Sequence, residues 1–483
     1  MFRRLWSGLP ETPKYPVDIE KLGYFINDDD EIRKIEDPKY YFKYFIDKNT
    51  YYNDCRRFSF DTTVQRIILA RLATLGLNPV RLPLGACEDE PHVLVMVSND
   101  LATADRVLLF IGETAQDLGV LAYRVVGGGG GIEQGSILSI VRAVREGGVA
   151  NDKDGKPPAI IIGNPGELFW WPEAHRSLSL PAVAGMPRPS AAHHAPRKYA
   201  ENTIPGHENA DAHVSSLFKD LLTCSAGAGL DLDGVESPMA KRTSVPRITA
   251  IGIAGGADAL EGFLDHPERW QQWGPRMDSL VVLGGLYEAH HIKTDAFRAF
   301  LRQRARAYIA SEAAVDTPVA GPDGNDQAAR ATRYGCPVHS SGTSWLTELM
   351  FIEARSAILA WGAMVANDPA YVNPQMDISY AEHIVKPEEQ TWANYKEEDD
   401  DGSAPKWGDL MQTDGDEKGD GEDDENKENQ GITGPAVGDT KMEGSDVNIS
   451  YGVEGVKATD EEADKVTVDD IKEKMAEVTL NEK

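Results

Sequence analysis

Short apolar runs alternate with segments of helical periodicity along most of this chain. Five runs have the length and composition of strands: residues 92–97, 106–111, 158–162, 248–251 and 279–283. The last four are continuously apolar, which is typical of parallel strands buried on both faces. Because helical segments separate the strands, the pattern predicts an α/β fold with a doubly wound, mainly parallel sheet.

The helical segments have apolar residues at a spacing of three to four positions. They cover residues 136–144, 214–222, 257–264 and a long helix through 64–72, which Gly76 is expected to end. Residues from about 170 to 213 are rich in Pro, Ala and His and have little periodicity. This stretch is predicted to be an irregular surface insertion.

Charge divides the chain into two parts. The net charge is −29, and Lys396–Lys483 alone carries 28 acidic and 10 basic residues. This segment has few apolar residues to bury, so we expect a domain over residues 1–390 and a disordered acidic tail over 391–483. The tail could compete for basic partners such as histones, or it could serve only solubility. Residues 466–478 have helical spacing and could form a short docking helix.

The sequence argues against several protein classes. No apolar run approaches the roughly 18–20 residues of a membrane helix, and residues 1–10 lack the apolar region of a secretory signal. The four cysteines are widely separated, which favours free thiols in a reducing compartment. We therefore expect a protein of the nucleus, the cytoplasm or both.

Residues 252–256 read Gly-Ile-Ala-Gly-Gly and lie between a predicted strand and a predicted helix. This is the layout of the nucleophile elbow of α/β-hydrolases, in which Gly-x-Ser-x-Gly presents a serine on a strained turn. Its members here are Gly252, Ile253, Ala254, Gly255 and Gly256. The methyl group of Ala254 cannot attack a carbonyl carbon, so the pattern predicts the shape of an elbow without its nucleophile. Glycines after a strand are also common in any α/β fold.

Four further motifs stand in a fixed order around this turn, at Leu22–Asp28, Val107–Gly112, Ile160–Pro165 and Ser341–Thr343. With them, the chain resembles the Argonaute-binding Arb-two domain family over residues 15–385. Relatives in that family include fungal proteins of small-RNA silencing, a metazoan co-transcriptional regulator and the C-terminal domain of a class II histone deacetylase. The resemblance implies an α/β-hydrolase-like fold and an interaction role, in the best known case within a complex that holds Argonaute with its small-RNA duplex.

The chain departs from the hydrolase signature of that family. Where the full signature has His-Gly, this chain has Ile111-Gly112, and Ala254 replaces the elbow serine. The late Gly-Thr motif is followed by a histidine in those members, but residues 344–348 contain none, although His339 lies just upstream. A triad needs nucleophile, base and acid together, so we expect no catalytic residues and interpret the chain as a pseudoenzyme.

The acid of a triad is also absent from its expected place. It commonly follows the strand after the elbow, where this chain has Gly284-Gly285, and Glu288 is the nearest carboxylate. The glycines at 127–131 lack the Gly-Lys-Ser/Thr of a phosphate-binding loop and are interpreted as a flexible loop. The pairs His193-His194 and His290-His291 have no further ligand at metal spacing. No cofactor and no metal are therefore expected.

Basic residues do not form a clear nucleic-acid track. Four arginines fall on one predicted helix, where Arg298 and Arg302 share a face at a spacing of four and Arg304 and Arg306 point elsewhere. Because nucleic-acid affinity depends on releasing counterions from phosphates, the acidic body and tail argue against strong direct binding. Protein partners are the expected class.

Aromatic residues follow three predicted strand or motif ends. They are Phe169, Trp170, Trp171, Tyr287 and Trp345. The carboxyl ends of strands form the ligand crevice of an α/β sheet, and Trp and Tyr contribute much interface energy. We predict an exposed partner-binding rim beside the vacated active site, or else aromatic residues that cap the sheet as core.

Three functions remain open from the sequence. The first is a non-catalytic α/β-hydrolase-like scaffold that resembles the Argonaute-binding proteins of small-RNA-directed heterochromatin silencing. The second is an adaptor associated with chromatin or a histone deacetylase complex and independent of Argonaute. The third is an active hydrolase with a non-standard site, which Ala254 argues against.

Overall fold

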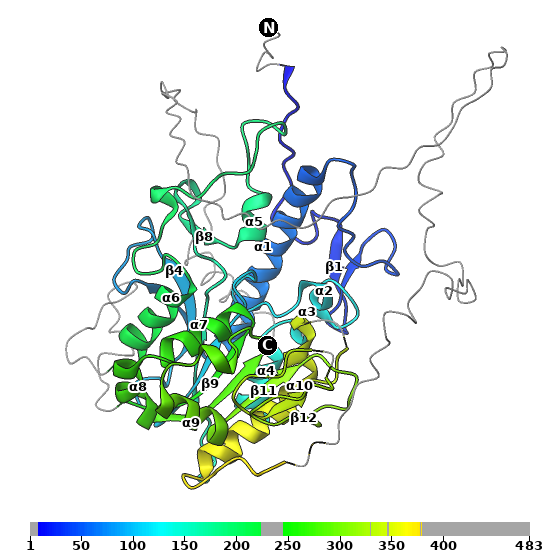
Figure 1. The fold of residues 1–483 in the computed structure, drawn as a ribbon. Helices are drawn as coiled ribbons and strands as arrows, with labels where there is room; N and C mark the ends of the chain where they lie inside the picture. Colours follow the sequence, from blue (N-terminus) through cyan, green and yellow to red (C-terminus); the bar gives the residue numbers. More distant parts are fainter. Residues whose placement is uncertain (1–7, 224–244, 329, 345–346, 377, 379–483) are drawn as a thin grey trace, which may run out of the picture. The chain divides into compact units, whose positions relative to one another are not determined.

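The computed structural model describes residues 8–223, 245–328, 330–344, 347–376 and 378. In this part of the chain nine strands form one mixed sheet in the order β12-β13-β11-β10-β9-β5-β6-β4-β3 (Figure 1). The strands are β3 (Leu77–Leu82), β4 (Val93–Ser98), β5 (Arg106–Ile111), β6 (Ala159–Gly163), β9 (Arg247–Ile253), β10 (Met277–Leu283), β11 (Ala305–Ile309), β12 (Pro318–Ala320) and β13 (Val338–Ser340). A separate hairpin pairs β1 (Tyr24–Ile26) with β2 (Ile32–Lys34).

The middle of the sheet is parallel, as predicted. Strands from β6 through β5, β9, β10 and β11 to β13 run in one direction, whereas β4 is antiparallel to both of its neighbours and β12 is antiparallel to β13. The five predicted strands correspond to β4, β5, β6, β9 and β10. The sequence pattern missed β3, which contains Pro79 and is an edge strand, where a missing backbone N–H is tolerated.

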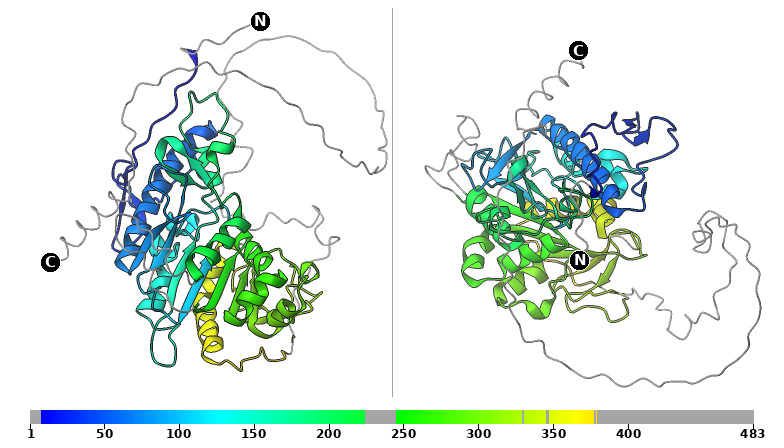
Figure 2. Two further views of the ribbon diagram at one scale, coloured as in Figure 1. Left: turned by 90° about the vertical axis from the view of Figure 1, so that its left-hand side faces the viewer. Right: turned by 90° about the horizontal axis from the view of Figure 1, so that it is seen from above.

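Helices cover both faces of the sheet (Figures 1 and 2). Along β5, Val107, Leu109 and Ile111 face one core, and Leu108 and Phe110 face the other. The first core is closed by α6 (Ala210–Ser216), a π-helical turn (Leu217–Leu222), α7 (Gly255–Leu264), α8 (Pro267–Trp273) and α9 (Asp295–Arg304). The second is closed by α1 (Thr50–Thr74), α2 (Tyr123–Val126), α3 (Gly131–Gln134), α4 (Leu138–Arg145) and α10 (Thr347–Asn367). The doubly wound arrangement is therefore confirmed.

The long predicted helix is α1, and its ends follow local rules. The Asn49 side chain accepts a hydrogen bond from the backbone N–H of Tyr51 at the N-terminus. At the other end Gly76 adopts a φ of +81°, which a residue with a side chain rarely takes. The helix packs on β3 and α4, so its buried side chains line one end of the sheet.

The predicted irregular insertion contains regular structure. Strands β7 (Phe169–Trp171) and β8 (Arg176–Leu178) form a hairpin, and α5 (Leu180–Ala184) follows it. Phe169, Leu178 and the apolar residues of α5 form a small core of their own. The prediction of an irregular insertion is therefore wrong for this part, because its apolar residues pack against each other rather than along a helical stripe.

Two smaller predictions need correction. Arg306 lies on β11 and forms an ion pair with Asp316 at 3.1 Å, so the helix ends at Arg304 and does not include it. The glycines at 127–130 join α2 to α3, which begins at Gly131, and Gly131 packs so closely that a Cβ there would lie 2.5 Å from the Asp30 carbonyl oxygen.

Helix α10 is long and apolar enough, by length and composition alone, to cross a membrane. Its apolar positions do not form a continuous run in the sequence, because a few polar residues interrupt them. Most of the helix is buried, and the Phe351 ring stacks on Phe110 of β5 with 5.2 Å between ring centroids. The buried apolar residues of α10 therefore belong to the second core. The expected acidic tail, 391–483, and the helix at 466–478 lie outside the described residues.

Candidate functional site

The turn between β9 and α7 has the sharp geometry that the sequence predicts. Ala254 sits between the strand and the helix with φ 47° and ψ −124°, which is unusual for a residue with a side chain. A Cβ atom on Gly252 would come within 2.6 Å of the Cα atom of Ala257, and one on Gly256 would overlap the carbonyl oxygen of Gly112. Both positions therefore require glycine, because α7 begins so close to β9 and to the end of β5 that a Cβ atom would not fit.

The turn is packed against the loops that follow the neighbouring strands. The backbone N–H of Ala254 donates to the Leu283 carbonyl oxygen at the end of β10, at 2.8 Å. A Cβ on Gly255 would lie 2.7 Å from the Thr114 hydroxyl oxygen, which places the loop after β5 directly beside the start of α7. The side chain at the centre of this turn is the half-buried methyl group of Ala254.

His339 does not lie beside the turn. It is in register with Tyr308, which is in register with Leu283, which is in register with Ile253. Three strand spacings of about 4.8 Å each therefore separate the His339 backbone from β9. The ring is buried, and its Nδ1 lies 3.0 Å from the backbone carbonyl oxygen and 3.2 Å from a carboxylate oxygen of Asp316. His339 is thus held at the far side of the sheet.

The carboxylates near the turn have structural partners. Asp258 of α7 accepts hydrogen bonds from the backbone N–H groups of Leu286 and Tyr287 at 2.6 and 3.0 Å, which ties the loop after β10 to the helix. Glu288 lies 3.2 Å from His290. Ser341 closes the end of β13 by donating to the Ile309 carbonyl oxygen at 2.8 Å.

The predicted aromatic rim does not form as expected. Trp170 is 2 % exposed, and its ring centroid lies 5.0 Å from that of His92. Phe169 is buried in the small core of the insertion. Trp171 is half-buried against Phe58. The prediction that these residues are exposed is wrong for Phe169 and Trp170, because Phe169 packs into the small core of the insertion and Trp170 into the first core of the sheet.

Tyr287 belongs to a different part of the sheet. It follows β10, three strands away from β6, and its hydroxyl donates to Asp265 at 2.8 Å. Burial and this hydrogen bond to a carboxylate raise the pKa of Tyr287. The structure therefore does not bring Tyr287 and the 169–171 segment together, and Trp345 lies outside the described residues.

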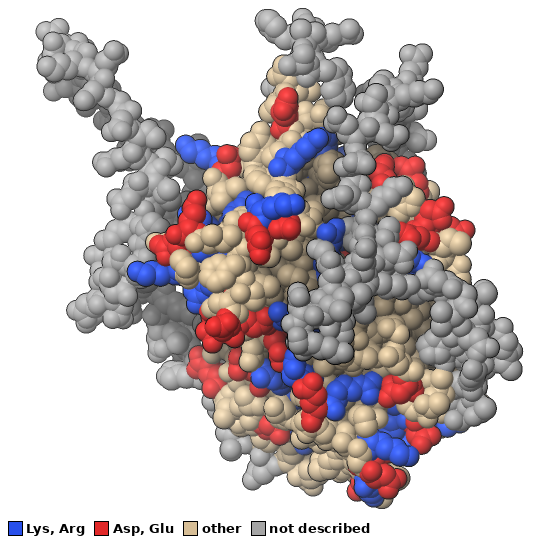
Figure 3. Space-filling view, turned by 180° about the vertical axis from the view of Figure 1, so that it is seen from behind, with Lys and Arg blue, Asp and Glu red and all other residues tan. Residues whose placement is uncertain are grey.

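The arginines of α9 act within the fold. Arg298 donates to the Ala289 carbonyl oxygen, Arg302 pairs with Asp323, and Arg304 donates to carbonyl groups after α10. On the face in Figure 3, basic and acidic side chains are interspersed over the described residues. Among those residues no group of three His, Cys, Asp or Glu side chains could hold a metal ion.

A buried polar cluster around Glu167 was not predicted from the sequence. One carboxylate oxygen of Glu167 accepts three hydrogen bonds, from Asn164 Nδ2 at 2.7 Å, the Leu118 backbone N–H at 2.9 Å and Gln65 Nε2 at 3.0 Å. Glu167 follows the Asn164-Pro165 motif by two residues, and this was the available signal. Gln65 stands among apolar residues of α1 and gave no signal of its own.

Ionisation within this cluster is strongly perturbed. Burial, and then the neighbouring Asp117, raise the pKa of Glu167 to about 7. The same two causes raise the pKa of Asp61 on α1. Tyr123 donates its hydroxyl hydrogen to Asp117. Buried carboxyl groups of this kind are costly to ionise, and such groups gather at functional sites more often than elsewhere.

Comparison with known proteins agrees with the resemblance seen in the sequence. The sequence model of the Arb2 domain matches residues 15–315, which include the turn at Ala254 and end before the Ser341–Thr343 motif. No curated protein matches the chain. The matched region spans more than half of the chain and nearly all of the sheet up to β11, and from this we conclude that the chain belongs to the Arb2 domain family.

Proposed function

We propose that this chain is a non-catalytic scaffold on an α/β-hydrolase-like framework that works through protein partners in small-RNA-directed silencing of heterochromatin. The observation that carries the proposal is Ala254, which occupies the strained position between β9 and α7 with a side chain that cannot act as a nucleophile. The remoteness of His339 supports it, since a serine at this position would also need an adjacent base.

The hydrolase-like part of the proposal rests on two features. The sheet is parallel through its centre, and the turn stands where the chain crosses from β6 on one side of β5 to β9 on the other. In α/β-hydrolases the backbone N–H after the nucleophile and one from an earlier loop form the oxyanion hole. The close approach of Gly255 to Thr114 in the loop after β5 supports this comparison.

The silencing part of the proposal rests on the family. The Arb2 domain family is the one whose resemblance implies Argonaute binding, and the acidic composition of the chain favours proteins over nucleic acids as direct partners. The loop after β10 is a candidate contact surface. It is fixed to α7 by Asp258, and Leu286 within it is 77 % exposed.

Purification of the tagged full chain from native extract would test the partner. We expect Argonaute and duplex small RNA to be recovered, as identified by mass spectrometry and RNA sequencing. Recovery of histones or a deacetylase complex without Argonaute would support the chromatin adaptor instead. Hydrolysis of ester substrates by the unmodified purified chain would overturn the non-catalytic assignment.

Two exposed leucines provide a matched test of the surface. Leu286→Ser alters the loop after β10, and Leu180→Ser alters α5, where the side chain is 68 % exposed. We expect Leu286→Ser to reduce Argonaute recovery and Leu180→Ser to leave it unchanged. Equal recovery with both variants would place the contact away from this loop.

A further inference from the structure

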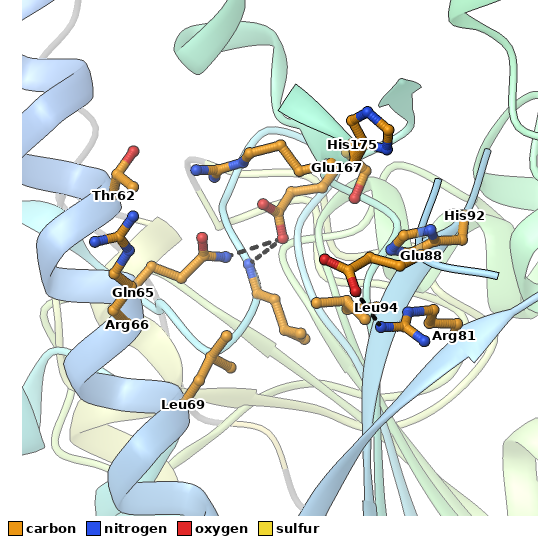
Figure 4. Close-up of a pocket in the computed structure, with 13 residues that line it drawn as sticks. Thr62, Gln65, Arg66, Leu69, Arg81, Glu88, His92, Leu94, Glu167 and His175 are labelled. Carbon is orange, nitrogen blue, oxygen red and sulfur yellow. Dashed lines mark hydrogen bonds and ion pairs between the residues drawn. The ribbon is translucent and has the colours of Figure 1, made fainter. Parts of the chain in front are cut away.

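A cleft opens at the carboxyl edge of the sheet, away from the Ala254 turn. It encloses about 680 Å³ of space, part of it open to solvent. Figure 4 shows side chains from α1, β3 and the start of β4 converging on it, with Glu167 at its centre. Its charged and ionisable lining residues are Arg66, Arg81, Glu88, His92, Glu167, His175 and Arg176.

Arg81 is the most buried of the three arginines that line the cleft. It is only 8 % exposed, and its Nε has no hydrogen-bond partner. Its nearest carboxylate, Glu88, stands 3.9 Å away, beyond hydrogen-bond distance, and the Glu88 side chain is 41 % exposed. A buried guanidinium with an unpaired donor is costly, and a second oxyanion at this place would relieve that cost.

Glu167 does not fill this role. One oxygen of Glu167 already accepts hydrogen bonds from Asn164, Leu118 and Gln65, and the charge of Arg176 offsets part of the rise in the Glu167 pKa. Among the lining residues, Glu88 is therefore the carboxylate closest to Arg81, at 3.9 Å, and a ligand carboxylate would take its place.

The remaining wall is apolar. Leu69 of α1, Leu94 of β4 and Leu118 of the loop after β5 line the cleft beside the charged groups. A phosphate dianion would bring two charges close to Glu88 and Glu167, whereas a carboxylate brings one and fits the planar guanidinium fork. An apolar chain attached to that carboxylate would contact the three leucines.

We propose that this cleft binds a small monocarboxylic acid with a short apolar chain, whose carboxylate displaces Glu88 and pairs with Arg81. Glu88 then acts as an exchangeable counterion that keeps Arg81 partly neutralised until the ligand arrives. This site is independent of the Ala254 turn and of the proposed role in silencing.

Isothermal titration calorimetry of the full chain with hexanoate tests this assignment. We expect saturable binding of one hexanoate per chain and no binding of hexan-1-ol, which has the same chain length without the charge, or of inorganic phosphate. Equal binding of hexan-1-ol, preferential binding of phosphate, or no saturable binding of hexanoate would each overturn the proposal.

Variants sharpen the assignment. Arg81→Gln is expected to weaken hexanoate binding by about 10-fold or more, the usual effect of losing a charged hydrogen-bond donor. Glu88→Gln is expected to strengthen it by about threefold, because the competing carboxylate is removed. Arg302→Gln on α9 is the matched control and should leave binding unchanged.

Because Arg81 is buried, Arg81→Gln could unfold the chain, and thermal melts must accompany the titrations. Arg176→Gln serves as a second variant, since Arg176 is half-buried and should tolerate replacement. Loss of affinity in a folded Arg176→Gln chain supports the site. Unchanged affinity in both folded arginine variants, or weaker binding after Glu88→Gln, contradicts it.

Discussion

The turn at Ala254 and the cleft around Arg81 both lie at the carboxyl edge of the same sheet, yet they differ in what they retain. The turn keeps a strained backbone, two indispensable glycines and close packing against the loop after β5, but its central side chain is a methyl group. The cleft has ordinary backbone on its strands but concentrates three arginines, two histidines and a buried carboxylate. The turn has the backbone of a recognisable motif without a reactive side chain, whereas the cleft has charged and ionisable side chains without a recognisable sequence motif.

This contrast shows that the turn and the cleft depend on different interactions. The backbone of the turn is needed to join β9 to α7, so packing alone is enough to retain it. The charged groups of the cleft cost free energy when buried and contribute nothing that apolar residues could not contribute to packing. We take that cost as the reason to look for a ligand there.

The largest expected effect breaks the turn. Gly256→Ala would drive a methyl group into the Gly112 carbonyl oxygen, and we expect a loss of about 4 kcal/mol in the free energy of unfolding, measured by urea denaturation. Gly262→Ala is the matched control in the same helix. Nothing lies within 4 Å of its added Cβ, so a gain of about 0.5–1 kcal/mol is expected. Similar effects at both positions would contradict the close approach of α7 to β5.

The next effect concerns Glu167 beside the cleft. Its pKa is raised from 4.5 to about 7, so the native state keeps a proton that the unfolded state releases between these values. Stability from this group is present at pH 5 and is lost as pH rises to 8, by about 3 kcal/mol.

Glu167→Gln removes that titration while keeping an acceptor oxygen. We compare the free energy of unfolding of Glu167→Gln with that of the unmodified chain by urea denaturation. This difference should shift in favour of Glu167→Gln by about 3 kcal/mol when the pH rises from 5 to 8. Glu268→Gln, at an exposed position of α8, controls for loss of a carboxylate. A difference between wild type and Glu167→Gln that does not change with pH would refute the assignment.

A smaller effect tests the strain at the turn. Ala254→Gly should raise the free energy of unfolding by about 1 kcal/mol, because glycine adopts a positive φ without the clash of a Cβ atom. Ala259→Gly, in the interior of α7, should lower it by about 1 kcal/mol. If both changes destabilise the chain equally, Ala254 is not strained.

The last prediction is that a hydroxyl group introduced at the turn gives no measurable hydrolysis. Ala254→Ser restores the hydroxyl group but not a base, since His339 stays three strands away. We expect no hydrolysis of p-nitrophenyl esters above the unmodified chain. Turnover by Ala254→Ser would mean that another group serves as the base, and the turn would then be a latent active site.

Local pattern predicted much of the framework. Strands β5, β6, β9 and β10 were visible as apolar runs because both of their faces are buried, and α1 was visible from its periodicity and Gly76. Strand β3 was not visible, because Pro79 and Arg81 interrupt its apolar pattern. The fate of Trp170 was not predictable either, since only the fold of the hairpin decides that it is buried.

The sequence by itself determined the layers of the fold and the sharp turn at Ala254, because both follow from residues close together in the chain. Only the tertiary structure decided which polar groups share the cleft. Gln65 and Glu167 are 102 positions apart, and Arg81 reaches the same place from a third element. Hydrophobic periodicity records which side chains face a core, whereas a cluster of charges depends on the distances between segments that no local pattern encodes.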